Sequence, residues 1–407
     1  ITGDDTLLEL GRKLYAQTEP YTEMFLAGDK LTRVGTIHAV NLAQGIKTPV
    51  VYWQADPQQK YLDALDCALD DLHRYHGYPT GMFSGDEAIH GTDPTQGVEL
   101  CTIVEYMFSL ETMYRITGDP KFAEQLDNNA YNELPAQVDD EFVTIQYFHH
   151  DNHENLTPGI RNFDVNHDGL DCCFGILTGY PCCTSNMHQG WPKFTQNLWY
   201  ATPANGVAVT QYAPSEVRMK VADGVDVRIA ERTNYPFEET VAFRIEEMAR
   251  PAQFPFTVRI PSWSESTEIR LNGEVVAFSV GEDRLATIGR EWSAGDELEL
   301  RFSPRVRLTH YEHTSSTPWN YALIQCPEDK LEEHYTVSVD PVKAAAVRPW
   351  SEEAAPVTIR TRAVRVPSWK EYNQMAGPLP YSIMYGLGTA EEAGIELIPY
   401  GCTTLRV

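Results

Sequence analysis

Ile116-Thr-Gly-Asp-Pro120 separates one predicted helix from the next and is the strongest sign of how the first half of the chain folds. An aspartate can cap the N-terminus of a helix, and proline is favoured in the first turn. The signal recurs as Ile1-Thr-Gly-Asp4 and, more weakly, as Gln54-Ala-Asp-Pro57. The copies are 52 residues apart (Asp4 to Asp56) and 63 residues apart (Asp56 to Asp119), about one helical hairpin with its loop. This repeat predicts stacked or ring-like helix pairs, and a toroid is the preferred interpretation.

Apolar residues at helical spacing extend on both sides of this stretch, over residues 1–202. The stripes are Leu7, Leu10 and Leu14; Val34, Ile37, Leu42 and Ile46; Tyr61, Leu65, Leu69 and Leu72; Ile103, Met107, Leu110 and Met113; Phe122, Leu126 and Ala130; and Met187, Trp191, Phe194 and Leu198. These stripes predict a helical domain over 1–202.

The apolar period changes from 3.6 to 2 near residue 203. Apolar residues alternate with polar ones in several runs, of which Val225, Val227 and Ile229 are one. Asn272-Gly273 between two such runs is typical of a type I′ hairpin. Short strands at this spacing predict a β-sandwich domain over 203–310. A second β-rich region is expected over 311–407.

Composition excludes some classes of partner. The 407 residues carry a formal net charge of −26, which repels phosphate backbones, so we expect no nucleic-acid partner. No run reaches the roughly 18 apolar residues that span a bilayer, so we expect no membrane partner. The eight cysteines include two adjacent pairs, which favours chemistry over structural disulfides and slightly favours a cytoplasmic, reducing location. Ile1 reads as internal to a domain, and we expect the chain to be a fragment.

Two short motifs could form a metal site. Val98-Glu-Leu-Cys101 places a carboxylate and a thiol two residues apart, on one side of an extended segment. Cys182 and Cys183 could meet Glu99 and Cys101 there, and three thiolates with one carboxylate suit Zn²⁺. The alternative is that these cysteines are buried small hydrophobic residues. Cys172 and Cys173 could replace the later pair or form a local redox couple.

Further residues could serve a glycosidase, which needs an acid and a nucleophile or base on opposite sides of the sugar. Gly81-Met-Phe-Ser-Gly-Asp-Glu87 ends in two candidate acids, Asp86 and Glu87, which could instead cap a helix or face solvent. Cys182 is a candidate nucleophile. His38, on the helical stripe with Val34, and Tyr147 could contact a sugar, although both residue types in such places more often pack in a core.

The combined motifs resemble one family. Gly81–Glu87, Val98–Cys101, Ile116–Asp119 and Pro181-Cys-Cys-Thr184 with Asn186-Met-His-Gln-Gly-Trp-Pro192 are similar to the β-L-arabinofuranosidases of glycoside hydrolase family 127. Arg259-Ile-Pro-Ser-Trp263, Asn272-Gly273 and Ile398-Pro-Tyr-Gly401 also fit. The resemblance covers nearly the whole chain, and the Glu-x-Cys motif combined with Cys-Cys is its most specific part.

This resemblance implies a retaining glycosidase with an (α/α)6 toroid, here incomplete on its N-terminal side, followed by β-sandwich domains. It implies a zinc ion held by Glu99, Cys101, Cys182 and Cys183. Cys182 would also be the nucleophile, Glu87 the general acid and then base, and His38 and Tyr147 would contact the sugar. The expected substrate is a β-L-arabinofuranoside or a related furanoside.

Two other hypotheses follow from the same residues. The chain could be a non-catalytic carbohydrate-binding protein whose cysteines hold a structural zinc. It could also be a toroidal hydrolase or lyase that uses paired carboxylates and has bystander cysteines. The latter would be insensitive to chelators and to thiol alkylation.

Overall fold

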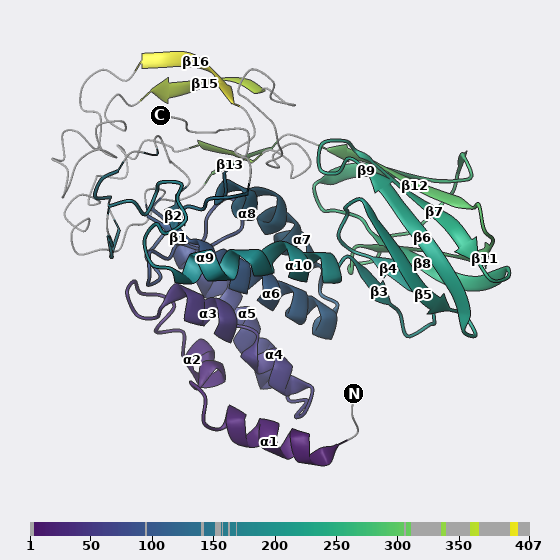
Figure 1. Cartoon of the computed structure of the whole chain (residues 1–407), viewed down its shortest axis with the longest axis horizontal. Coiled ribbons are helices and arrows are strands. Elements are labelled where there is room, and N and C mark those ends of the chain that lie inside the picture. The colour runs from purple at the N-terminus through teal and green to yellow at the C-terminus, as the bar shows by residue number, and fades with distance from the viewer. Residues whose placement is uncertain are drawn as a thin grey trace.

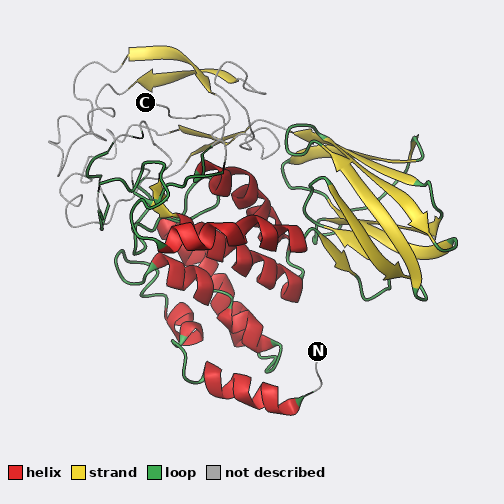
Figure 2. Ribbon diagram, viewed as in Figure 1, coloured by secondary structure: helices red, strands yellow, loops and turns green. Residues whose placement is uncertain are grey.

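The chain folds into a helical part followed by two β-sheets (Figures 1 and 2). The computed structural model describes residues 4–304 except 94–95, 140–141, 151–155, 157, 162 and 168, together with the backbone of four later strands. These strands are β13 (Arg307–His310), β14 (Tyr335–Ser338), β15 (Ile359–Arg365) and β16 (Glu391–Leu397). The rest of the β-rich region expected over 311–407 lies outside the described residues. No helix in the described ranges is long and apolar enough to cross a membrane.

The helical part contains helices of very different length, joined by loops and one two-stranded ladder. The helices are α1 (Asp5–Tyr15), α2 (Tyr21–Ala27), α3 (Ala39–Gly45), α4 (Thr48–Trp53), α5 (Gln59–His76), α6 (Leu100–Thr117), α7 (Pro120–Asn128), the π-helix η1 (Asn129–Glu133), α8 (Leu134–Ala136), α9 (Cys182–Asn186), η2 (Met187–Gln189) and α10 (Gly190–Gln196). The ladder pairs β1 (Val98–Glu99) with β2 (Phe148–His149).

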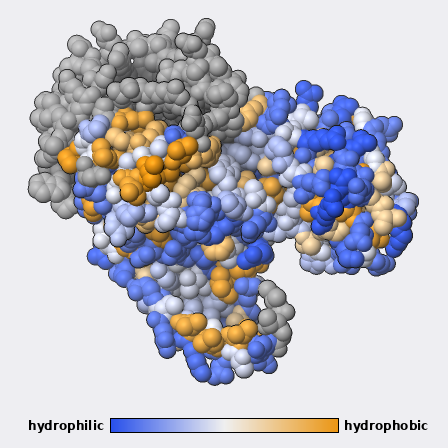
Figure 3. All heavy atoms as spheres, viewed as in Figure 1, coloured by the Kyte–Doolittle hydropathy of each residue, from blue (hydrophilic) through white to orange (hydrophobic). Residues whose placement is uncertain are grey.

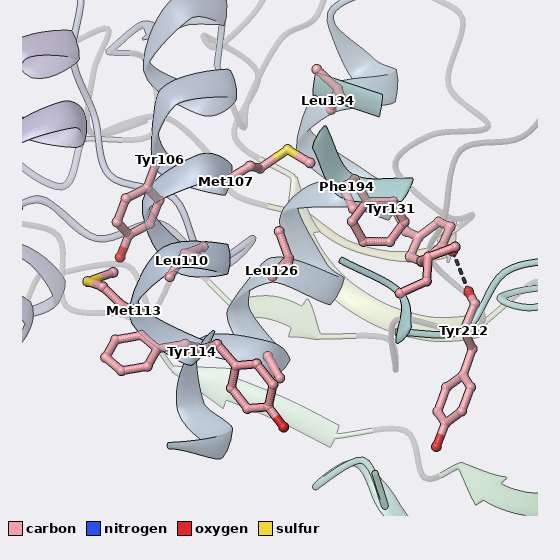
Figure 4. Packing of buried hydrophobic residues seen from close by; sticks show 14 of the residues in the cluster. Tyr106, Met107, Leu110, Met113, Tyr114, Leu126, Tyr131, Leu134, Phe194 and Tyr212 are labelled. Atoms are coloured by element: carbon pink, nitrogen blue, oxygen red, sulfur yellow. Dashed lines mark hydrogen bonds between the residues drawn. The ribbon is translucent and has the colours of Figure 1, made fainter. Parts of the chain in front are cut away.

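Helix α6 is the centre of the helical part. Nearly all of its side chains are buried, because it contacts α3, α4, α7 and α10 on different faces. Figure 4 shows Met107, Leu110 and Met113 of α6 among the buried side chains, with Tyr131 and Phe194 from neighbouring elements. A helix that is apolar around its circumference belongs in a core. By contrast, Leu7, Leu10 and Leu14 of α1 are about half exposed and form an apolar surface (Figure 3).

The repeated aspartates have different roles in the structure. Asp4 and Asp119 accept a hydrogen bond from the backbone N–H two residues later and cap α1 and α7, as predicted. Asp56 does not cap α5, which begins at Gln59. Its side chain instead accepts hydrogen bonds from Gln58 Nε2 and from the Tyr61 hydroxyl.

The predicted helical stripe from Val34 to Ile46 is wrong in its first half. Helix α3 begins only at Ala39, and His38 is its extended N-cap. The preceding backbone pairs with residues 87–89 instead: Gly35 N–H donates to Ile89 O, and Ile89 N–H donates to Ile37 O. His38 therefore leaves the helical stripe and lies beside the loop that carries Glu87.

Two sheets follow α10 and face each other. One has the order β10-β9-β12-β7-β6-β5 and the other β11-β8-β4-β3. The strands are β3 (Trp199–Ala201), β4 (Val207–Val209), β5 (Ser215–Val221), β6 (Val225–Thr233), β7 (Thr240–Met248), β8 (Ala252–Arg259), β9 (Ser264–Leu271), β10 (Glu274–Val275), β11 (Leu285–Trp292) and β12 (Glu297–Pro304).

Buried aromatic rings fill the space between the sheets. The ring centroids of Phe243 on β7 and Phe256 on β8 are 5.3 Å apart, and Trp292 on β11 is 5.6 Å from Phe256. The predicted alternation is confirmed on β6, where Val225, Val227 and Ile229 are buried. The hairpin at Asn272-Gly273 is also confirmed, since both residues have positive φ and join β9 to β10.

Candidate active site

Three cysteines and a glutamate converge beside the β1–β2 ladder. Glu99 ends β1, Cys101 lies in the first turn of α6, and Cys182 and Cys183 begin α9. The Sγ atoms of Cys182 and Cys183 are each 3.6 Å from Glu99 Oε1 and 4.0 Å from each other. Cys183 Sγ lies 3.3 Å from Cys101 Sγ. The structure thus brings together all four residues predicted as metal ligands.

Glu99 and Cys101 meet by a different local route from the predicted one. Both residues were predicted on one extended segment, but the strand ends at Glu99 and α6 begins at Leu100. Only the turn from strand to helix aims both side chains at one point. The cause is that β1 pairs with β2 for two residues, after which Leu100 N–H donates to Tyr147 O.

The cluster has the dimensions of a zinc site. In a tetrahedron with Zn–S bonds of about 2.3 Å and a Zn–O bond of about 2.1 Å, sulfur atoms are about 3.8 Å apart and sulfur–oxygen pairs about 3.6 Å apart. The Cys182–Cys183 separation and both sulfur–oxygen separations agree with this set, whereas Cys183 Sγ and Cys101 Sγ, at 3.3 Å, lie closer together than two zinc-bound sulfurs. Glu99 is 1% exposed, and its Oε2 has no hydrogen-bond partner among the described residues. A buried carboxylate without a proton or a cation is costly, so the residues fit a metal ion.

Charge in the cluster is unevenly distributed. Burial, then the nearby charges of Glu87 and Cys182, raise the pKa of Glu99 to about 9. Hydrogen bonds from Cys101 and Cys183 hold the pKa of the Cys182 thiol far below its usual range. Burial raises the pKa of Cys183 well above its usual range. Cys182 is therefore the thiol that most readily ionises, which is the property a nucleophile needs.

Glu87 is held next to this cluster by backbone pairing. Gly85 N–H donates to Gly97 O, and Glu99 N–H donates to Gly85 O, so the Glu87 loop runs along β1. Glu87 itself has a φ of 87°, which non-glycine residues rarely adopt, and its carbonyl accepts from Ala39 N–H. Such strained residues gather at functional sites.

Three side chains contact the Glu87 carboxylate. His38 Nε2 lies 2.9 Å from Oε2, the Tyr147 hydroxyl donates to Oε1 at 2.7 Å, and His167 Nε2 lies 3.2 Å from Oε1. Burial alone would raise the pKa of Glu87, but the hydrogen bonds from His38 and Tyr147 outweigh it. The pKa therefore lies below its usual range.

Tyr147 links the carboxylate to the cysteines. Its hydroxyl is 2.7 Å from Glu87 Oε1 and 3.6 Å from Cys182 Sγ. The ring packs closely on Gly179, where a Cβ would lie 2.4 Å from Tyr147 Cγ. Only glycine allows this approach, and Gly179 also has a positive φ of 64°. Tyr147 thereby orients the loop that leads to Cys182.

Asp86 and Glu87 point into different surroundings. Asp86 is fully buried, with Oδ1 2.6 Å from His90 Nδ1 and Oδ2 accepting from Asp164 N–H at 2.7 Å. Asp86 belongs to neither cluster of potential ligand atoms among the described residues, whereas Glu87 lies close to both Glu99 and His38. The geometry therefore favours Glu87 as the acid in the loop.

Cys172 and Cys173 lie apart from the four-residue cluster. Cys172 is buried, and burial raises the pKa of its thiol. Cys173 Sγ donates to Leu156 O at 2.9 Å. Neither belongs to a metal-capable group among the described residues.

His167 and Asp171 were missed in the sequence. His167 Nδ1 lies 2.7 Å from Asp171 Oδ1, while its other nitrogen reaches Glu87. The only signal was a histidine four residues before an aspartate, in a loop without regular periodicity. That spacing is too common to single out a site.

Two family models match the chain. Residues 1–196 match the model described as beta-L-arabinofuranosidase, GH127 catalytic domain, and residues 206–303 match beta-L-arabinofuranosidase, GH127 middle domain. Together these matches cover well over half of the chain. No curated protein matches it.

Solved structures resemble the chain as well. A GH127 beta-L-arabinofuranosidase from Geobacillus stearothermophilus T6 is 17% identical with a TM-score of 0.63, over 92% of this chain and 59% of that one. A GH127 beta-arabinofuranosidase is 18% identical with a TM-score of 0.61 and the same coverages. A structure described as a glycoside hydrolase is 17% identical with a TM-score of 0.69, over 100% of this chain and 71% of that one. The chain thus spans less than two thirds of the two GH127 structures. At identities this low, the likeness shows a shared fold alone.

Proposed function

The chain belongs to glycoside hydrolase family 127, and from that premise we propose that it is a retaining glycosidase of β-L-arabinofuranosides or a related furanoside. Cys182 is the nucleophile and Glu87 the general acid and base. The observation that carries this proposal is the Tyr147 hydroxyl, which lies 2.7 Å from Glu87 and 3.6 Å from Cys182. The two reacting groups can be no further apart than the sum of these distances. Both groups can therefore reach the two sides of one glycosidic bond, as a retaining mechanism requires.

The proposed reaction has two steps. The Cys182 thiolate attacks the anomeric carbon as the bond to the leaving oxygen breaks, and Glu87 gives that oxygen a proton. A water molecule then attacks the glycosyl-cysteine, with Glu87 taking its proton, and the thiolate leaves. Two inversions at the same carbon retain its configuration. The site supports these roles because the neighbouring thiols lower the pKa of the Cys182 thiol, and because the Tyr147 hydroxyl contacts both Cys182 and Glu87.

Zinc is the metal that we propose for the cluster, held by Glu99, Cys101, Cys182 and Cys183. When bound, it would stabilise the thiolates near neutral pH. His38, whose side chain is 39% exposed, is proposed to contact a sugar hydroxyl, together with Tyr147. The helices are proposed to form part of an (α/α)6 toroid over residues 1–202, followed by a β-sandwich domain over 203–310 and a second β-rich region over 311–407.

Metal content tests the proposed cluster directly. The purified protein should hold about one zinc ion per chain, because four donors saturate a structural site. Cys183→Ala should lose most of this zinc and unfold at a lower temperature, since bound metal stabilises the folded state. Cys67→Ala changes an exposed thiol on α5 and should keep the zinc. A wild-type chain without zinc after growth in zinc-rich medium would refute the cluster as a metal site.

Glu87→Gln tests the acid and base. Its hydrolysis of an aryl β-L-arabinofuranoside should fall by roughly 10²–10⁴-fold, the usual contribution of general acid–base catalysis. Zinc content should stay unchanged. The matched control is Glu23→Gln, at an exposed position on α2, which should hydrolyse the substrate like the wild type. Full activity in Glu87→Gln would remove Glu87 from the mechanism.

A further inference from the structure

Both ring nitrogens of His167 face carboxylates. Nδ1 is 2.7 Å from Asp171 Oδ1, and Nε2 is 3.2 Å from Glu87 Oε1. The first contact is a hydrogen bond and the second an ion-pair contact, and a carboxylate oxygen offers only lone pairs, so a hydrogen on each nitrogen suits both contacts. The imidazolium form of His167 is the one that matches both contacts.

His38 differs in this respect, although it contacts the same glutamate. Its Nδ1 accepts the Asn41 backbone N–H at 3.5 Å, so this nitrogen uses its lone pair. Only Nε2 then carries a hydrogen, which points at Glu87 Oε2 at 2.9 Å. His38 thus faces Glu87 with one nitrogen only, whereas His167 is the histidine beside Glu87 whose two nitrogens both face carboxylates.

The proposed reaction needs such a proton. Glu87 must protonate the leaving oxygen, yet its hydrogen bonds from His38 and Tyr147 favour the carboxylate. Tyr147 is a poor source, because burial raises the pKa of its hydroxyl far above the usual range. A carboxylate that is ionised at rest must receive its proton from a neighbour.

We propose that His167, held by Asp171, stores the proton that Glu87 delivers to the leaving oxygen. This inference rests on the proposed glycosidase function. As Cys182 Sγ bonds to the anomeric carbon and the bond to the leaving oxygen breaks, that oxygen takes a proton from Glu87. Glu87 takes the Nε2 proton of His167 in turn, which leaves His167 neutral. When water releases the sugar from Cys182, its proton passes through Glu87 back to His167. The site returns to its starting charge.

The surroundings of His167 keep this pair in place. Among the described residues, the titratable groups that contact the ring are Glu87, Asp171 and Tyr147. The Tyr147 ring meets it edge-on, with centroids 4.8 Å apart. Asp171 is 2% exposed, and its carbonyl accepts from the N–H groups of both Tyr147 and Phe148 at 2.9 Å. These backbone hydrogen bonds hold Asp171 beside Tyr147, and the Asp171 carboxylate in turn positions His167.

His167→Gln separates proton storage from simple positioning, because glutamine can still donate to Glu87 but cannot carry the proton. With an alkyl β-L-arabinofuranoside, whose leaving group needs protonation, kcat should fall roughly 100-fold. With a dinitrophenyl glycoside, which leaves without a proton, kcat for the first step should stay close to wild type. Equal losses on both substrates would show a merely structural role and overturn the proposal.

The pH profile gives a second readout. In the wild type, the alkaline limb of kcat/KM reports loss of the stored proton. In His167→Gln this limb should move to lower pH, because Glu87 alone, with its lowered pKa, must then hold the proton. An unchanged limb would contradict the proposal. The exposed histidine of α5 supplies the matched control, since His73→Gln should leave rates and profile unchanged.

Nitrogen NMR of the His167 ring tests the proposal without turnover. Both nitrogens should be protonated at pH 7 in the wild type, and Asp171→Asn should shift the ring toward its neutral form. A neutral His167 in the wild type at pH 7 would overturn the inference. If the wild type hydrolyses neither glycoside, the proposed function fails, and the NMR result still decides the protonation state of His167.

Discussion

Cys182→Ala is expected to lower turnover of an aryl β-L-arabinofuranoside by at least about 10⁴-fold, because removing a nucleophile removes the covalent route. Its Sγ is the thiol of the cluster that ionises most readily and the one in contact with the Tyr147 hydroxyl. No neighbouring thiol can take its place. Cys183 is fully buried, and Cys101 is 3% exposed. The measurement is aryl release by wild type and variant at equal protein concentration.

Two comparisons make that result specific. Cys67→Ala, at an exposed thiol on α5, should retain wild-type turnover. Mass spectrometry after a rapid quench should find one added pentose on Cys182 in the wild type and none in the variant. Turnover in Cys182→Ala above about a tenth of wild type would exclude Cys182 as the nucleophile. Zinc binding without any turnover in the wild type would instead support the carbohydrate-binding alternative.

Arg259→Met should destabilise the protein by about 3–5 kcal/mol, the usual cost of removing one partner from a buried ion pair. Arg259 on β8 is fully buried, with Nη1 2.9 Å from Glu124 Oε1 and Nη2 3.3 Å from Asp127 Oδ2. Both acids lie on α7, so the guanidinium joins the sheets to the helices. Asp127 is also fully buried, and burial raises its pKa even beside Arg259. Without the arginine, Asp127 must protonate or remain an unpaired buried charge.

Urea unfolding measures this loss as a lower midpoint. The matched control is Arg290→Met on β11, where the side chain is 36% exposed and its nearest acid oxygen, on Asp296, is 3.8 Å away. That change should cost no more than about 1 kcal/mol. If Arg259→Met lost no more than the control, Arg259 would not join the two parts energetically.

The partners of Arg259 could not be predicted from the sequence. The run Arg259-Ile-Pro-Ser-Trp263 contributed to the family resemblance, but nothing local assigned its arginine a partner. Those partners are Glu124 and Asp127, more than 130 residues earlier in the chain. Nearby contacts, such as Gln211 Nε2 to Ala123 O at 2.9 Å and the Tyr131 hydroxyl to Tyr212 O at 2.5 Å (Figure 4), also join residues more than 80 positions apart in sequence. Side-chain pairing at such separations leaves no periodic signal.

Predictions from short sequence patterns were confirmed where the adjacent residues decide the backbone conformation. They located the caps at Asp4 and Asp119 and the hairpin at Asn272-Gly273, because each depends on a few adjacent residues. They failed at His38, whose segment hydrogen-bonds to residues 87–89 instead of continuing a helix. A long-range backbone ladder overrode the helical spacing there.

The types of ligand and acid could be predicted without coordinates: a Glu-x-Cys motif, a cysteine pair and a loop that ends in Asp86 and Glu87. These follow from residue chemistry and family resemblance. Only the tertiary structure decided that Glu87 faces the cysteines, that Asp86 turns to His90, and that His167 joins Asp171 to Glu87. The physical reason is that proton positions and charge depend on distances of about 3 Å between separate loops. Those distances are set by the β1–β2 ladder and by the packing around α6.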